Sequence, residues 1–168
     1  MTAKTFLAVI SAGLISVGLA FAASDASAQL TERNVSLATA RVIADAAVTS
    51  CKMAGFDVTV AVVDKAGDVR ILLRNDLANP HNAELARRKA YTSRTFRRPS
   101  LEWAKLTAGG AELAGQRELA DVIPLGGGMP IAIGTETIGA VGVSGATSQE
   151  ADEACAKAGL AAAANLLR

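Results

Sequence analysis

Residues 124–145 read PLGGGMPIAIGTETIGAVGVSG, and this stretch decides the fold. Three consecutive glycines lead into an apolar run, a polar link follows, and a second apolar run completes the stretch; these segments are 126–128, 129–133, 134–137 and 138–143. Two short β-rich runs across a short polar link predict an antiparallel hairpin. Gly139 and Gly142 interrupt the second run. Because glycine weakens a strand, its usual reason there is the close approach of a helix, another backbone or a ligand.

The segments on either side of this hairpin alternate between strand and helix patterns. Residues 58–64 and 69–74 predict a second hairpin, and the first of these strands is apolar on both faces, which implies layers above and below the sheet. Helical periodicity predicts three long helices, with N-caps at Thr31, Asn79 and Thr147. The first covers about 32–54, the second is opened by Asn79-Pro80 and stopped by Pro99, and the last covers about 148–167. A shorter helical piece begins at Ser100. Two hairpins without a βαβ crossover indicate a mostly antiparallel sheet in an α+β domain.

The composition is that of one globular domain. The chain has 168 residues, of which 51% are hydrophobic and only 4% aromatic, so a closely packed core of small residues is expected. A net charge of +1 gives no electrostatic footprint for nucleic acid.

Residues 1–28 are predicted to be a signal peptide. Lys4 precedes an almost unbroken apolar stretch, 6–23, and Ala26-Ser27-Ala28 matches the small-x-small pattern of a cleavage site. The alternative is an uncleaved membrane anchor, because the apolar run approaches the length that spans a bilayer. We expect cleavage, a mature domain over 29–168, and export to the periplasm or beyond.

The two cysteines fall in the first and last predicted helices. An oxidising compartment would permit a bridge between Cys51 and Cys155. The sequence is compatible with a structural disulfide and equally with two buried cysteines that act as small hydrophobic residues. A catalytic thiol is not expected, because no base is recognisable beside either cysteine.

Familiar site motifs are absent from the sequence. The glycines at 126–128 lack a following Gly-Lys-Ser/Thr and lead into a strand, so they are not a phosphate loop. His81 is the only histidine, and no cluster of His and Cys offers closed metal coordination. An imidazole at a helix start lies near the positive end of the helix dipole, which disfavours imidazolium and leaves a lone pair for a metal. The alternative is an ordinary exposed residue of the first turn.

Basic residues follow His81 on the same helix. Arg87, Arg88 and Lys89 could meet the propionates of a tetrapyrrole whose iron His81 binds, with Tyr91 nearby; the alternative is a solvated basic face. The thioether of Met129 is a ligand that haem iron accepts, although a gap-filling core residue is the interpretation we favour.

These residues carry a resemblance to the GlcG/HbpS family of haem-binding, also called haem-degrading, proteins. The similar segments cover nearly all of residues 31–167; they are Gly127-Gly128-Met129-Pro130-Ile131, the run Ile138 to Gly145, Ala61-Val62-Val63-Asp64 with Gly67, Arg74-x-Asp76 and Lys89-Ala90-Tyr91-Thr92. The resemblance implies a profilin-like three-layer α-β-α sandwich around an antiparallel sheet of about five strands. It also implies a homo-oligomer, often an octamer, and a haem or related tetrapyrrole site. The sequence departs from the usual family pattern at Asn79-Pro80-His81, which could supply a new axial ligand.

Three functional hypotheses follow. The leading one is an exported, oligomeric binding protein for haem or a similar tetrapyrrole, with His81 as the iron ligand, Arg87, Arg88 and Lys89 toward the propionates, and residues 126–129 (Gly126, Gly127, Gly128 and Met129) as a wall. The second is a cofactor-independent enzyme for a small acidic metabolite that uses Lys89, Tyr91 and Asp76 near the glycine loop. The third is an accessory or sensor subunit of a periplasmic system.

Overall fold

The computed structural model describes residues 30–168. The chain divides into two units, Met1–Thr31 and Glu32–Arg168, and every helix and strand of the described range lies in the second unit. The predicted signal peptide, 1–28, lies outside the described residues, as does the apolar run that raised the alternative of an anchor. Within residues 30–168, no helix combines the length and the apolar character needed to cross a bilayer.

Four antiparallel strands form one sheet in the order β2-β1-β4-β3. Their bounds are β1 Thr59–Asp64, β2 Val69–Arg74, β3 Gly128–Ile133 and β4 Glu136–Ser144. Each of the two predicted hairpins is confirmed. The sheet nevertheless has four strands in the described range, not the expected five or so. The segment between residues 106 and 128 contributes a 3₁₀ helix at residues 114–118 and no strand.

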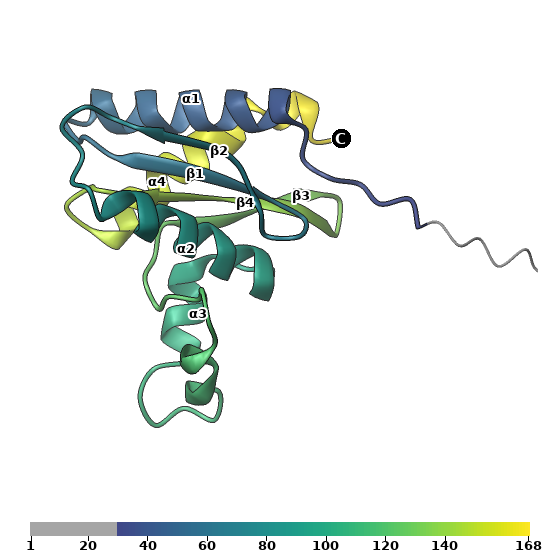
Figure 1. Ribbon diagram of the computed structural model, residues 1–168, viewed down its shortest axis with the longest axis vertical. Helices are drawn as coiled ribbons and strands as arrows, with labels where there is room; N and C mark the ends of the chain where they lie inside the picture. Colours follow the sequence, from purple (N-terminus) through teal and green to yellow (C-terminus); the bar gives the residue numbers. More distant parts are fainter. Residues whose placement is uncertain (1–29) are drawn as a thin grey trace, which may run out of the picture. The chain divides into compact units, whose positions relative to one another are not determined.

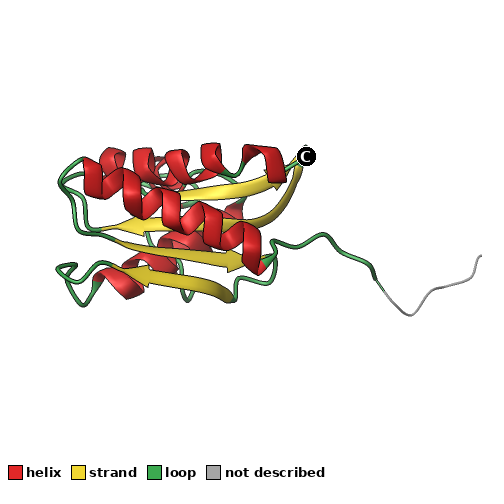
Figure 2. Cartoon of the chain, turned by 90° about the horizontal axis from the view of Figure 1, so that it is seen from above, coloured by secondary structure: helices red, strands yellow, loops and turns green. Residues whose placement is uncertain are grey.

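Helices cover both faces of the sheet, as Figures 1 and 2 show. On one face lie α1 and α4, and on the other lies α2, which contacts β1, β3 and β4. Beyond α2 come α3 and the 3₁₀ segment η1. The bounds are α1 Leu37–Met53, α2 Asn82–Phe96, α3 Ser100–Leu106, η1 Ala114–Glu118, α4 Gln149–Ala162 and a terminal 3₁₀ turn, η2 Ala164–Leu166. The expected α-β-α sandwich is thus confirmed.

Small side chains let the layers approach closely. A Cβ at Gly142 of β4 would clash with the carbonyl oxygen of Ala86 in α2 and would lie 2.6 Å from the Ala90 nitrogen. On the other face, a Cβ at Gly159 of α4 would lie 2.5 Å from the Ile43 oxygen of α1. The expectation that strand glycines permit close approach is confirmed, and at Gly142 the approaching group is a helix of the same chain.

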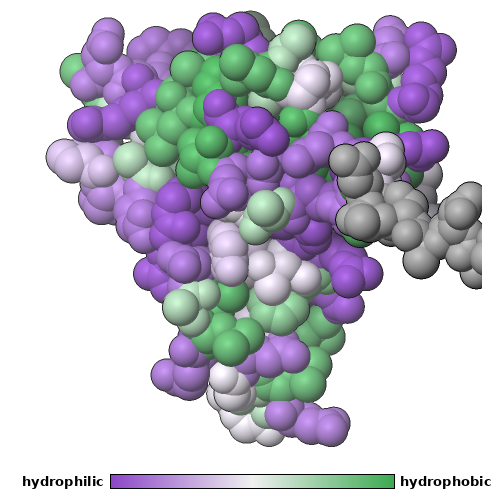
Figure 3. Space-filling view, turned by 45° about the vertical axis from the view of Figure 1, so that its right-hand side comes forward, coloured by the Kyte–Doolittle hydropathy of each residue, from purple (hydrophilic) through white to green (hydrophobic). Residues whose placement is uncertain are grey.

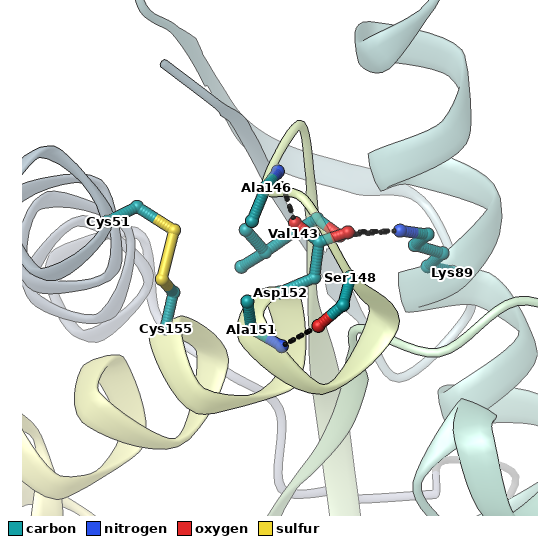
Figure 4. Close-up of a disulfide and its surroundings, with 8 residues drawn as sticks. All are labelled: Cys51, Lys89, Val143, Ala146, Ser148, Ala151, Asp152 and Cys155. Carbon is teal, nitrogen blue, oxygen red and sulfur yellow. Dashed lines mark hydrogen bonds and ion pairs between the residues drawn. A yellow bond between two sulfur atoms is a disulfide. The ribbon is translucent and has the colours of Figure 1, made fainter. Parts of the chain in front are cut away.

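A disulfide joins the two helices of one face. Cys51 of α1 and Cys155 of α4 are bonded at an S–S distance of 2.06 Å, with the two Cα atoms 5.5 Å apart (Figure 4). Both cysteines are buried. Of the two alternatives that the sequence left open, the structural disulfide is the one observed.

The N-caps differ from the predicted ones at all three long helices. Ser36 caps α1 and Ser148 caps α4, each accepting a hydrogen bond from a backbone N–H three residues on, and His81 occupies the N-cap position of α2. The first helix does not start at Glu32, because Val35 is buried outside the helix and donates to the Ile138 oxygen. The polar link of the β3–β4 hairpin is also shorter than predicted, since Ile133 pairs with Glu136.

Candidate functional site

His81 stands at the surface, directly before α2. The preceding turn is closed by the N–H of Asn82, which donates to the Asn79 oxygen at 3.0 Å, and the His81 oxygen accepts from Leu85 N at 3.0 Å. The imidazole itself makes no capping hydrogen bond, and the residue is exposed. The backbone is therefore fixed by the turn and the helix, while the ring is available to an external group.

The surroundings of His81 combine apolar and basic side chains. Helical spacing places Leu85 and Arg88 on the same flank of α2 as His81, one and two turns further along. Leu77, in the loop before the helix, is 78% exposed. This flank, defined by His81, Leu85 and Arg88 and preceded in the sequence by Leu77, offers a ring nitrogen, apolar contact and a cation.

The two arginines hold a neighbouring loop against α2. Arg87 donates to Glu84 and, at 2.7 Å, to Asp121, and Arg88 donates through Nη2 to the Val122 oxygen. The hydrogen bond from Arg87 lowers the pKa of the Glu84 carboxyl, and the Glu84 and Asp121 carboxylates raise the pKa of Arg87. The Nε of Arg88 is buried and makes no hydrogen bond within the described residues. The Arg88 Nε is thus an unsatisfied donor that lies below the surface.

Lys89 points into the protein, away from the two arginines. Its ammonium donates to Asp152 Oδ2 of α4 at 2.7 Å and to the Val143 oxygen at 3.1 Å, and Asp152 Oδ1 accepts from Ala146 N at 2.9 Å (Figure 4). Both side chains are about 5% exposed or less. Burial raises the pKa of the Asp152 carboxyl, and the Lys89 charge opposes that rise. The structure therefore separates Lys89 from the surface cations with which the sequence had grouped it.

The glycine loop, 126–128, is held from inside the chain. Gly126 N donates to the Gln149 side chain, and Gly128 N donates at 2.8 Å to Ser100 Oγ, which in turn donates to the Leu125 oxygen. A Cβ at Gly127 would lie 2.8 Å from Asp152 Cβ and 3.2 Å from Lys89 Nζ. The space beside these glycines is filled by the same chain, so the loop packs against α2 and α4.

The remaining candidates lie elsewhere. Met129 packs with the core on the α1–α4 face, whereas His81 belongs to the opposite face. The ring of Tyr91 lies against the β1–β2 turn at Gly67, and Asp76 is exposed in the loop after β2. The structure does not bring Lys89, Tyr91 and Asp76 together as the enzyme hypothesis requires.

The sequence had not pointed to the roles of Asp152, Ser100 and Gln149. The burial of Lys89 could have been predicted from the sequence, because Asn82, Ala86, Lys89 and Ser93 recur at the spacing of one helix face. All four of these residues are buried. Its buried partner on α4 could not be found this way, since the two residues are 63 positions apart. Within residues 30–168, no group of three or more His, Cys, Asp or Glu side chains could hold a metal ion.

The fold and this flank together define an α-β-α sandwich domain that carries one exposed imidazole at a helix start. The chain belongs to the family described as "Haem degrading protein HbpS-like", which matches residues 35–161. The resemblance seen in the sequence is thereby confirmed, and the protein is a member of a haem-related family.

Solved structures show the same fold. Klebsiella pneumoniae protein ORFY has a TM-score of 0.77 and 26% identity, over 82% of this chain and 96% of that one. HbpS has a TM-score of 0.76 and 34% identity, over 80% of this chain and 93% of that one. PduOC, solved as a complex with haem, has a TM-score of 0.71 and 28% identity, over 76% of this chain and 94% of that one.

Proposed function

We propose that this chain is an exported, self-associating protein that binds haem or a closely related tetrapyrrole at the flank of α2 that begins with His81. The observation that carries the proposal is the imidazole of His81, which is exposed and makes no capping hydrogen bond. Family membership supports haem as the ligand class, and so does the haem complex of PduOC.

The residues of the flank suit the group. A neutral imidazole nitrogen is a common axial ligand of haem iron. Leu77 and Leu85 provide apolar contact for a macrocycle, and the half-buried guanidinium group of Arg88 suits a propionate. Bound haem would supply redox and oxygen chemistry, and the protein would supply the ligand, the apolar contact and the counter-charge. Lys89, with its ammonium on Asp152, is left out of this assignment.

The disulfide supports export. Structural disulfides persist in oxidising compartments and are rare in the cytosol, and Cys51–Cys155 is a buried bridge. Together with the signal-peptide pattern of residues 1–28, it favours a periplasmic or secreted protein. N-terminal sequencing of protein recovered from the native host should begin at Gln29; an intact N-terminus would contradict the proposal of cleavage.

Titration with hemin tests the ligand assignment. We expect wild-type protein to shift the Soret band of added hemin, and His81→Ala to abolish the shift, with partial recovery on addition of free imidazole. Asn79→Ala, an exposed change two residues away, is the matched control and should titrate as wild type does. An unshifted wild-type spectrum would overturn haem binding, whereas an unchanged His81→Ala titration would overturn only the assignment of the ligand.

A further inference from the structure

The loop between β2 and α2 leads directly into His81. It covers residues 75–81 and passes from the end of β2 to the start of α2 (Figure 1). Leu77 is 78% exposed, and Asn79 and Pro80 are exposed as well. The surface of the domain is also open in Figure 3, where hydrophilic side chains separate apolar patches. The affinity of a ligand bound to groups on an open surface depends on how firmly those groups are held.

Ala78 is the buried residue of this loop. It is 3% exposed, and its N–H donates to the Asn75 oxygen at 3.0 Å. Its oxygen accepts two hydrogen bonds from Arg74 of β2, one from Nε at 2.9 Å and one from Nη2 at 2.6 Å. Both backbone groups of Ala78 are therefore satisfied, and a single side chain satisfies the carbonyl.

The position of Arg74 is set by the sheet. Arg74 is the last residue of β2 and pairs with Thr59 of β1. The next residue, Asn75, donates from its N–H to the Val58 oxygen at 3.0 Å. The Arg74 guanidinium forms no ion pair with a carboxylate among residues 30–168. Because hydrogen bonds from a charged donor are the stronger ones, the two bonds of Arg74 tie the loop firmly to the sheet.

The other end of the loop is fixed beneath the start of α2. The Asn82 N–H donates to the Asn79 oxygen at 3.0 Å. Asn82 is 4% exposed, and its Oδ1 accepts from Ser144 Oγ of β4 at 3.4 Å. His81 therefore lies between two anchored residues, Ala78 and Asn82, while His81 itself stays exposed.

We propose that Arg74 is a positioning residue for the axial ligand: by holding the Ala78 carbonyl, it fixes the loop that places the His81 imidazole. Arg74 acts through the backbone of the loop, three residues before the ligand. Side chains that orient a metal ligand change metal affinity by about 10–100-fold when they are removed. The role of Arg74 rests on the proposed function, in which His81 binds the iron, and deepens it by naming the residue that prepares this site.

Backbone order in protein without haem tests whether Arg74 holds the loop. We expect Arg74→Met to lower the amide order parameters of residues 76–81 from about 0.85 to below about 0.6 in NMR relaxation, because Ala78 loses its tie to the sheet. Arg70→Met is the matched control; it removes another arginine of β2, which pairs with Asp64 at 3.0 Å, and it should leave the loop ordered. A loop that is equally ordered in Arg74→Met and in the wild type would overturn the role.

A double-mutant cycle with hemin separates positioning from charge and from folding. We expect Arg74→Met to weaken hemin binding about tenfold in Soret titrations. The absorption maximum of the saturated complex should stay unchanged, because His81 is still the ligand. In His81→Ala supplied with free imidazole, the ligand no longer depends on the loop, so adding Arg74→Met should leave the hemin affinity unchanged.

The outcomes distinguish this role from haem binding itself. Equal weakening by Arg74→Met in both backgrounds would overturn the positioning role, because it would indicate either attraction of the propionates by charge or a general defect of folding. Unchanged hemin affinity in Arg74→Met would overturn the role as well, and both results would leave haem binding standing. A wild-type protein that does not shift the Soret band would overturn the proposed function, while the order parameters would still decide whether Arg74 holds the loop.

Discussion

Lys89 and Asp152 meet in the interior, where the end of β4 passes between α2 and α4. Their ion pair spans 2.7 Å and is shared with the Val143 oxygen and the Ala146 N–H. Removing one member of a buried pair leaves an uncompensated charge, which costs more than the pair itself contributes. The pair therefore fixes the position of α4 and of the glycine loop relative to α2, even though it lies away from the proposed ligand.

Replacing Lys89 tests this role. We expect Lys89→Met to lower the free energy of unfolding at pH 7 by about 3–5 kcal/mol, because Asp152 would be left buried without its cation. Lys52→Met is the matched control; the Lys52 side chain is 59% exposed in its pair with Asp57, so a loss of about 1 kcal/mol or less is expected. Urea unfolding measures both, and equal losses in the two variants would contradict the buried role.

The same pair sets a direction for pH dependence. Burial raises the pKa of Asp152 in the folded state, so the folded protein holds this proton more tightly than the unfolded chain does. The contribution of Asp152 protonation to the free energy of unfolding is then complete below the pKa of Asp152 in the unfolded chain. This contribution is lost as the pH rises through the pKa of Asp152 in the folded protein. Lys89→Met raises that pKa further.

The defect of Lys89→Met should accordingly shrink as the pH falls from 7 toward 4, because Asp152 takes up a proton in the variant. Urea midpoints of the variant and the wild type across this range measure the effect. A defect that grows on acidification would contradict the assigned direction.

At the residue scale, the position of a side chain at a helix start could be predicted from the sequence, whereas a contact with a residue distant in the sequence could not. His81 was expected near a helix start, and it lies there. Lys89 was grouped with Arg87 and Arg88 because the three are consecutive, but successive residues of a helix point in different directions. The partner of Lys89, Asp152, is set by the packing of α2 and α4 over the sheet, which no local pattern records.

The contact between α2 and the β3–β4 hairpin is the central packing feature among the elements. At Gly142 the backbone of α2 occupies the place where a side chain would stand, with Ala86 and Ala90 as the facing residues. Gly142 needs no unusual φ angle there. Its requirement is therefore for space alone.

Adding a methyl group at position 142 tests how much space this contact leaves. We expect Gly142→Ala to lower the free energy of unfolding by about 3 kcal/mol, because the clash is with backbone that cannot move aside independently. Gly109→Ala is the matched control, since nothing lies within 4 Å of its added Cβ and its φ angle is ordinary. Thermal unfolding should leave the control near wild type; a tolerated Gly142→Ala would contradict the close packing of α2 on β4.

The hairpins could be predicted from alternation and glycine punctuation, whereas the helix starts could not. Thr31 and Thr147 are acceptable N-caps by residue type, but Ser36 and Ser148 accept the capping bonds. At α1 the reason is tertiary, because Val35 lies in the core and donates a hydrogen bond to Ile138 before the helix begins. Local propensity cannot register that attraction.

For the whole molecule, the disulfide closes a long loop between the first and last helices. Cys51 and Cys155 are 104 residues apart, and in the chain-entropy description a loop of about 100 residues gives roughly 4.7 kcal/mol. We expect the double variant Cys51→Ala/Cys155→Ala to lose about 2–5 kcal/mol in urea unfolding. A reductant should leave the variant unchanged while weakening the wild type, and equal stability of the two proteins would contradict a structural role.

The layered architecture followed from the order of elements, while the strand count and the bridge did not. Two hairpins already implied four strands, and the expectation of a fifth came from the resemblance alone. The cysteines could be placed on two helices, but whether those helices touch depends on how α1 and α4 share one face of the sheet.

The absorption spectrum of the protein isolated from its native host tests haem binding most directly, because a ligand held at the His81 flank should copurify. We expect a Soret band that stays with the protein through gel filtration and is lost in His81→Ala expressed in the same host. A colourless wild-type protein that also leaves the spectrum of added hemin unchanged would contradict the assignment of this chain as a tetrapyrrole-binding protein.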